Sequence, residues 1–149
     1  MGKIQKRIMG IDFGLERVGI AISDKLHIAI STEPTLIYSN HNFWNELIKL
    51  ILEREVGGII IGIPYDDNEE HPMRKHIETF ESKLQTELEK LNLIVFIAHQ
   101  DESYSSKEAV TTMLKIGKKK KKRSQKGNID AVSAGLILQE WLEVNLINN

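Results

Sequence analysis

The sequence predicts a single α/β domain in which helices flank a mixed five-stranded sheet. Three observations lead to this prediction. The length of 149 residues suits one domain, 41% hydrophobic residues can build one sizeable core, and no repeat or long linker divides the chain. Three strand patterns come first, and helix patterns then alternate with two further strands, which gives a mixed sheet covered by helices. Residues 1–149 are therefore expected to form one domain.

The first three strands are expected to form an antiparallel meander. Residues 7–13 and 18–23 are short apolar runs separated by a turn, which is the pattern of a β-hairpin. A third short strand is expected around residues 27–31, and Pro34 discourages continuation into a helix.

The middle of the chain alternates between helix and strand patterns. Apolar residues at helical spacing predict a helix over 42–55, which Gly57 and Gly58 are expected to end. The β-branched run at 59–63 predicts a parallel strand buried on both faces, closed by Pro64. A long amphipathic helix should then extend to about Leu91.

A second continuously apolar strand is predicted over 93–98, and two helices follow it. Ser103 or Ser105 is expected to cap the first of these helices, which runs to about residue 115. Asn128 is expected to cap the second, over 129–144. Three apolar residues of this last helix are expected to face the core: Val132, Leu136 and Leu142.

The charge of the chain is divided unevenly. The net charge is −1, but residues 115–126 carry eight basic and no acidic side chains, so the remainder carries −9. Clustered Lys and Arg release counterions from nucleic acid, so this segment predicts a polyanionic partner. A solvated loop is the alternative interpretation. The residues expected to bind nucleic acid are Lys118, Lys119, Lys120, Lys121, Lys122, Arg123 and Lys126.

The sequence also indicates the cellular compartment of the protein. The chain has no cysteine, which excludes disulfides and thiolate metal sites. The apolar stretch after the basic N-terminus is interrupted by Asp12 and Arg17, so it lacks the core of a signal peptide. No run approaches the roughly 18 apolar residues that a membrane span needs. We expect a cytoplasmic protein.

Asp12 is the first candidate site residue, because it lies in the middle of an apolar strand. An unpaired carboxylate is costly to bury, so a partner must compensate it. Arg17 or turn amides could do so, and a bound cation is the other interpretation. Gly10 and Gly14 on either side allow a backbone or a ligand to approach closely.

Asp101 and Glu102 form the second candidate position. They follow the strand predicted to finish at Ala98, at the end where α/β sheets present ligand groups. Only one of the two need point at a site, because successive residues leaving a strand diverge. A surface pair is the alternative. Asp130 is the third candidate, expected in the first turn of the last helix, where the macrodipole alone favours an acid.

Together these acids suit a magnesium site. Mg²⁺ takes a few carboxylates and keeps water and phosphate as its other ligands, so a sparse acidic cluster without His or Cys fits it better than zinc. We expect Asp12, Glu102 and Asp130 to bind Mg²⁺, with Mn²⁺ as the alternative ion, and Asp101 competes with Glu102. Two such ions would activate water against a phosphodiester.

Four segments resemble the YqgF/RuvX family, relatives of the RuvC Holliday-junction resolvases. They are GIDFGLERVGIAISD at 10–24, IIIGIP at 59–64, DESYSSKEA at 101–109 and NIDAVSAGLILQEWLE at 128–143. The resemblance implies a ribonuclease H-like fold and a role in processing the precursor of the small-subunit ribosomal RNA. It also aligns Asp12, Asp130 and Arg17 with family positions, and we assign Arg17 to nucleic-acid binding.

Two segments depart from the family pattern. Ser103 stands where the family usually has Arg after Asp-Glu, which removes a cation that could contact phosphate or orient the carboxylates. The loop after Pro64 reads YDDNEE rather than the family's Asn-x-Asp-Gly pattern.

The leading functional hypothesis is a metal-dependent endonuclease that processes the 5′ end of pre-16S rRNA during ribosome biogenesis. A Holliday junction resolvase acting on DNA and a catalytically silent RNA-binding ribosome-assembly factor are the alternatives. GIDFG at 10–14 also resembles the phosphate loop of actin-like ATPases. Those proteins hold nucleotide between two such domains, and this chain is long enough for one.

Overall fold

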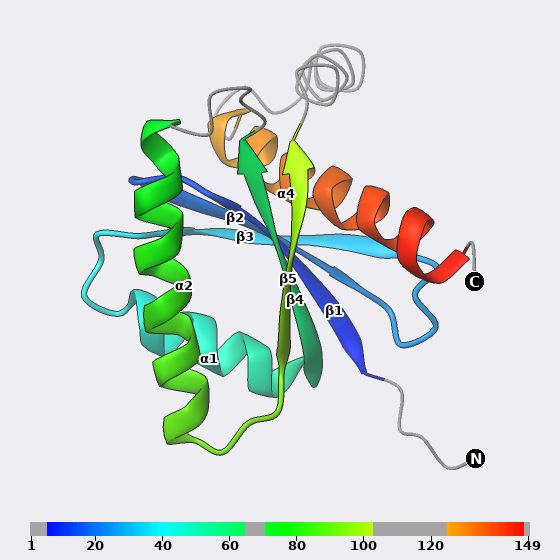
Figure 1. Cartoon of the computed structure of the whole chain (residues 1–149), viewed down its shortest axis with the longest axis horizontal. Helices are drawn as coiled ribbons and strands as arrows, with labels where there is room; N and C mark the ends of the chain where they lie inside the picture. Colours follow the sequence, from blue (N-terminus) through cyan, green and yellow to red (C-terminus); the bar gives the residue numbers. More distant parts are fainter. Residues whose placement is uncertain (1–5, 65–70, 103–124, 148–149) are drawn as a thin grey trace.

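A computed structural model describes residues 6–64, 71–102 and 125–147, and the side chains of 129–145 within the last range. The described residues form a five-stranded sheet of order β3-β2-β1-β4-β5 with helices on both faces (Figure 1). The elements are β1 (Arg7–Phe13), β2 (Arg17–Ser23), β3 (Ile30–Ile37), α1 (Phe43–Glu53), β4 (Val56–Pro64), α2 (Pro72–Lys90), β5 (Phe96–Glu102), α4 (Gln125–Leu142) and the π-helical segment η2 (Glu143–Ile147).

The predicted mixed sheet is confirmed. β1 and β2 are antiparallel, as are β2 and β3, and they form the expected meander. β4 lies parallel to β1 on one side and to β5 on the other. β1, β4 and β5 therefore finish at the same edge of the sheet, which we call the carboxyl edge: Phe13, Pro64 and Glu102. The start of α4 lies at this edge beside the ends of β4 and β5 (Figure 1).

The two faces of the sheet have separate cores. Strand alternation sends Met9, Ile11 and Phe13 toward α1 and α2, where sixteen buried residues form the larger cluster. Ile8 points to the other face and packs with residues of α4 in a cluster of five. No helix within the described ranges is long and apolar enough to cross a membrane.

The end of α1 differs from the prediction. The helix ends at Glu53 with Arg54 as its C-cap, and Glu55 takes a left-handed conformation with φ of 54°. Gly57 and Gly58, which we expected to end the helix, lie inside β4. A Cβ at Gly58 would lie 2.1 Å from the Phe96 ring, so close packing between β4 and β5 accounts for this glycine.

Both edge strands were also predicted with the wrong bounds. β3 covers Ile30–Ile37 rather than 27–31 and contains Pro34, which lies where its pairing with β2 shifts register. An edge strand tolerates proline because its missing N–H costs no ladder hydrogen bond there. β5 covers Phe96–Glu102 rather than 93–98, so only its first three residues belong to the predicted apolar run, and all its residues are half-buried or exposed.

The last helix begins earlier than predicted. α4 starts at Gln125, so Asn128 lies within the helix and is not its cap. Leu142 is buried as expected, whereas Val132 and Leu136 are only half-buried. Small residues face the sheet instead, because the helix backbone comes very close: a Cβ at Gly10 would lie 2.6 Å from the carbonyl oxygen of Ala134. The helix predicted from 103 to about 115 lies outside the described residues.

Candidate functional site

Asp12 is a half-buried residue of β1 that points to the α4 face. Its place follows from strand alternation, because Ile8 belongs to the core beneath α4 and Gly10 lies against Ala134 and Leu138 of that helix. Asp12 is paired with Gly19 of β2. Its carboxylate therefore emerges under the beginning of α4, close to the carboxyl edge.

Glu102 reaches the same face from β5. Ala98, four residues earlier, packs with the α4 core, so alternation directs Glu102 to the α4 side. Oε2 of Glu102 is 3.0 Å from the position that a Cβ would occupy at Gly62. Since Gly10 is paired with Ile60, the parallel register brings Asp12 level with Gly62. The carboxylate of Glu102 thus lies over the strand that separates it from Asp12.

Asp101 points the other way. It is exposed and shares its face with His99, whose Nε2 lies 2.6 Å from Oε1 of Glu81 on α2. β5 is longer at its C-terminal end than predicted, so Asp101 and Glu102 are its last two residues and alternate strictly. Of these two acids, only Glu102 shares a face with Asp12.

Asp130 lies in the second turn of α4, because the helix begins at Gln125. A Cβ at Gly19 would be 2.1 Å from the backbone oxygen of Asp130, so the helix rests directly on the strand pair that contains Asp12. Nε of Arg17 donates a 2.9 Å hydrogen bond to Oδ2 of Asp130. Arg17, weighed from the sequence as a partner of Asp12, is thus the partner of Asp130.

The three acids converge on one face without forming a closed cluster. Within the ranges described, no three His, Asp or Glu side chains gather closely enough to hold a metal ion. The carboxylate of Asp130 is turned toward Arg17. The donor set itself, hard carboxylate oxygens with neither His nor Cys among the three, is the set that Mg²⁺ prefers. The residue types therefore fit the expected ion.

Asp24, at the end of the motif that contains Asp12, has a structural role. Its Oδ1 accepts a 2.8 Å hydrogen bond from the backbone N–H of Ile28 and closes the turn before β3. This bond is the main reason that the pKa of Asp24 lies below its ordinary value. β2 runs antiparallel to β1, so Asp24 lies at the opposite end of the sheet from the carboxyl edge.

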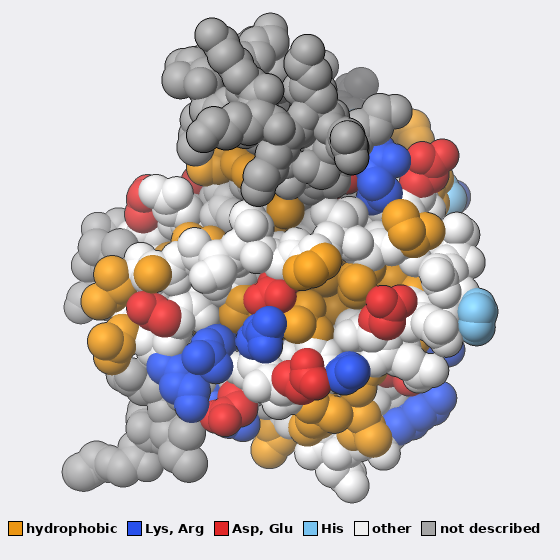
Figure 2. Space-filling view, turned by 180° about the vertical axis from the view of Figure 1, so that it is seen from behind, with side chains coloured by type: hydrophobic (Ala, Val, Ile, Leu, Met, Phe, Trp, Pro, Cys, Tyr) orange, Lys and Arg blue, Asp and Glu red, His pale blue; other side chains and the backbone are white. Residues whose placement is uncertain are grey.

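The predicted basic residues are only partly described. Arg17 lies beside the acids, whereas residues 118–123 lie outside the described ranges, and so does the side chain of Lys126. Figure 2 shows acidic and basic side chains next to one another on the face that it displays, with hydrophobic side chains between them.

Gly19 and Gly62 are residues of this region that sequence reasoning did not assign to it. Each is a single glycine within an apolar strand, a pattern that signals close approach of another group. The approaching groups are the backbone of Asp130 at Gly19, and Ile137 with the Glu102 carboxylate at Gly62. The identity of those groups could not be read from the pattern.

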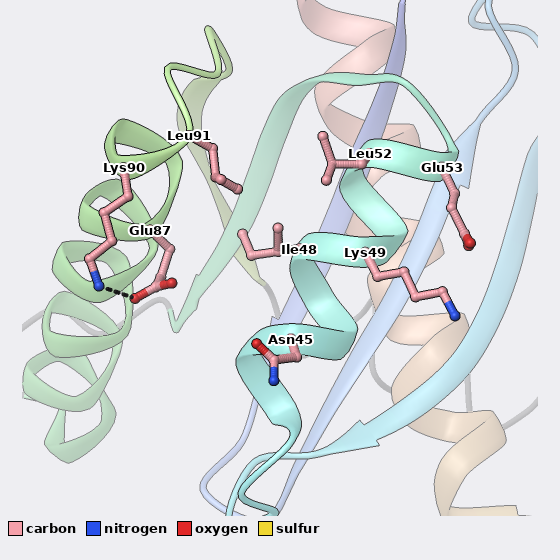
Figure 3. Close-up of a pocket in the computed structure, with 8 residues that line it drawn as sticks. All are labelled: Asn45, Ile48, Lys49, Leu52, Glu53, Glu87, Lys90 and Leu91. Atoms are coloured by element: carbon pink, nitrogen blue, oxygen red, sulfur yellow. Dashed lines mark hydrogen bonds and ion pairs between the residues drawn. The ribbon is translucent and has the colours of Figure 1, made fainter.

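A pocket between α1 and α2 lies away from these acids (Figure 3). Ile48 and Leu52 of α1 point toward Leu91, which follows the end of α2, and Lys90 pairs with Glu87 at the side. The remaining lining residues are Asn45, Lys49 and Glu53. The lining residues Glu87 and Lys90 belong to the last turn of α2, and Figure 1 shows this end of the helix far from the carboxyl edge.

The sheet order and the flanking helices define the ribonuclease H-like class of fold. Two solved structures match it over 94% of this chain. The Fowlpox virus resolvase in complex with Holliday junction DNA has a TM-score of 0.56, 13% identity and 99% of its own chain covered. RuvC of T. thermophilus in complex with a Holliday junction has a TM-score of 0.53, 9% identity and 96% coverage.

The chain belongs to the RuvX family. The family model, described as Holliday junction resolvase, matches residues 6–144. Relatives named "Putative pre-16S rRNA nuclease" include one from Bacteroides fragilis, 36% identical with 92% of this chain and 96% of the relative covered. A second, from Chlorobium luteolum, is 31% identical with 96% and 98% covered. The resemblance seen in the sequence is confirmed, and the chain is a member of a nuclease family.

Proposed function

We propose that this protein is a metal-dependent endonuclease that hydrolyses phosphodiester bonds at the 5′ end of pre-16S rRNA, in the cytoplasm. The names of its relatives support the substrate, and its family supports the reaction. One observation carries the proposal. Asp12 and Glu102 project on the same face of the sheet at the carboxyl edge, with a glycine on the strand between them.

In this proposal Asp12 and Glu102 hold Mg²⁺, with Mn²⁺ as a substitute. Asp130, whose half-buried carboxylate pairs with Arg17, would join them once it leaves that partner. The bound ion would activate the attacking water and stabilise charge on the leaving oxygen. The guanidinium of Arg17, once free of Asp130, can donate to a phosphate oxygen at the same place.

Glu102, rather than Asp101, is assigned to the metal. Asp101 faces α2 and His99, and a carboxylate on that face is separated from Asp12 by the sheet itself. The assignment therefore follows from strand alternation and does not depend on an exact distance.

The basic segment supplies the remaining substrate contacts in this proposal. Lys118 to Arg123 and Lys126 lie in the sequence between Glu102 of β5 and Asp130 of α4. Both acids are near the carboxyl edge, so the basic segment joins two elements at the proposed site. Sequence-independent contacts to phosphates would then account for most of the affinity.

The decisive substitution is Asp12→Asn. It keeps the shape of the side chain and removes the charge that would bind the ion, so we expect magnesium-dependent cleavage of pre-16S rRNA to fall by at least about 100-fold. Folding should be retained, as measured by thermal unfolding. The matched control is Asp24→Asn, the same chemical change at the other end of the sheet. Equal cleavage by the Asp12→Asn and wild-type proteins would refute the site.

The second candidate function is a resolvase of DNA junctions. The description of the family and the two structural neighbours bound to Holliday junctions favour it. Purified protein should be offered the rRNA precursor and a four-way DNA junction under the same magnesium concentration. Cleavage of the RNA with mapped products at its 5′ end supports our proposal, and cleavage of the junction alone supports the resolvase.

A catalytically silent RNA-binding assembly factor is the third candidate, and Ser103 in place of the family's Arg favours it. Cells that carry only the Asp12→Asn form distinguish it from an enzyme. Normal 16S rRNA ends in those cells would favour the silent factor, and accumulation of precursor would favour the nuclease.

A further inference from the structure

Arg74 lies at the carboxyl edge and has no place in the site described above. It belongs to the first turn of α2, immediately beside the end of β4. Its Nη2 donates to the carbonyl oxygen of Pro64 at 3.5 Å, the limit of a hydrogen bond. Its Nε is buried and has no hydrogen-bond partner in the part of the chain that the structure describes. Thus a guanidinium at the end of a parallel strand keeps an unused donor.

The described residues around Arg74 do not compensate its charge. Among the described residues no carboxylate forms a salt bridge with it, and the first turn of α2 contains no acid. A cation near the N-terminus of a helix is opposed by the macrodipole, and a buried donor without a partner opposes folding as well. An anion at the half-buried guanidinium would relieve the first of these penalties.

Arg74 and Glu102 approach the same residues from opposite faces of the sheet. Pro64, whose carbonyl Arg74 contacts, is paired with Glu102 in the parallel register of β4 and β5. Arg74 comes from the α2 side, because its helix packs on that face through Met73 and Ile77, and Glu102 points to the α4 side. A strand of nucleic acid that crosses the carboxyl edge to reach Glu102 would pass Arg74.

We propose that Arg74 is a substrate-binding residue that holds a non-scissile phosphate of the nucleic-acid backbone. The inference rests on the proposed function, which supplies the polyanion. Guanidinium groups match phosphate oxygens with two parallel N–H donors. Arg74 thereby fixes the register of the strand while the carboxylates act on a neighbouring phosphate.

The test is the salt dependence of binding to a labelled RNA that spans the 5′ end of pre-16S rRNA. Binding is measured by fluorescence anisotropy in EDTA, where magnesium-dependent cleavage does not proceed. Arg74→Gln should weaken binding and make the slope of log affinity against log salt shallower by about 0.7 to 0.9, the value of one phosphate contact. Arg74→Lys should recover much of the slope, because lysine keeps the positive charge although it lacks the paired N–H donors of the guanidinium group.

Lys90→Gln is the matched control, since it removes a cation from the opposite end of the same helix and should leave the slope unchanged. An unchanged slope in Arg74→Gln overturns the inference, and so does a fall in its melting temperature, which would indicate a purely structural contact with Pro64. Absence of RNA binding by the wild-type protein would instead refute the proposed function.

Discussion

The two faces of the sheet are built in different ways. Large side chains fill the face beneath α1 and α2: Phe80 is fully buried and its ring lies 4.8 Å from Phe13 and 5.4 Å from Trp44, between centroids. On the α4 face, Gly10 and Gly19 let the backbone of the helix approach the strands. The acids Asp12, Glu102 and Asp130 belong to this second face.

The first face therefore contributes mainly to stability, and the second face carries the candidate site. The core of the first face contains sixteen buried residues and that of the second face five, and burial of apolar surface is the main favourable contribution to folding. The second face buries less, and its geometry is set by backbone contacts that leave no room for a Cβ. Substitutions on the first face should therefore change stability, and substitutions at the close backbone contacts of the second face should also displace the acids.

The largest expected effect on stability follows Phe80→Ala. Removal of this ring from the aromatic cluster leaves a cavity and should cost about 3–5 kcal/mol in the free energy of unfolding. Chemical denaturation measures this loss of stability. Cleavage per folded molecule should be unchanged. Phe96→Ala is the matched control, because Phe96 is 46% exposed and packs on Gly58 and Trp141 at the edge of the sheet. A larger loss from Phe96→Ala than from Phe80→Ala would contradict the comparison of the faces.

Gly19→Ala should have the next largest effect. The new methyl group would lie 2.1 Å from the backbone oxygen of Asp130, so α4 must move away, at a cost of about 1–3 kcal/mol. Under the proposed function, cleavage should fall as Asp130 moves with the helix.

Gly135→Ala on α4 is the control for that substitution, since its nearest neighbours would be 3.8 Å away. It should stabilise the helix by up to about 1 kcal/mol and leave cleavage unchanged. If the two variants behave alike in thermal unfolding and cleavage, close approach at Gly19 is not what positions the helix.

The smallest expected effect is the pH dependence of stability that comes from Glu87, on the surface of α2. Lys90 and, to a lesser degree, Lys83 hold the pKa of Glu87 below its ordinary value of 4.5. A lowered pKa in the folded state means that the stabilisation is present above pH 4.5 and is lost as pH falls through the folded value. The exposed lysines limit it to about 0.3–0.5 kcal/mol per pair.

Glu87→Gln removes this contribution. Its free energy of unfolding should therefore lie slightly below that of the wild-type protein at pH 6 and converge with it near pH 3. Urea denaturation at both values measures the difference. A gap that widens toward acid would reverse the sign that the pKa of Glu87 predicts.

The sequence predicted the fold better than the site, for physical reasons. Order and pairing of the strands follow from apolar patterns and connection rules, which are local. The bounds of β3 and β5 were wrong because edge strands are only partly buried, and their apolar pattern is weak. The contact between Arg17 and Asp130 joins residues 113 positions apart, which no local pattern encodes.

The choice between Asp101 and Glu102 shows how a boundary error reaches the site. With the strand ending at Ala98, both acids belonged to a loop and either could point to the metal. The strand continues to Glu102, and alternation then assigns the two acids to opposite faces. Because β5 is four residues longer than predicted at this end, Glu102 rather than Asp101 is expected to bind the metal.

The most direct test of the central claim compares Glu102→Gln with Asp101→Asn in magnesium-dependent cleavage of pre-16S rRNA. Each variant removes one charge from adjacent residues, so overall charge and folding are matched. If the α4 face holds the site, kcat/KM should fall by at least about 100-fold in Glu102→Gln and change little in Asp101→Asn. Loss of cleavage in Asp101→Asn with retention in Glu102→Gln would contradict the account.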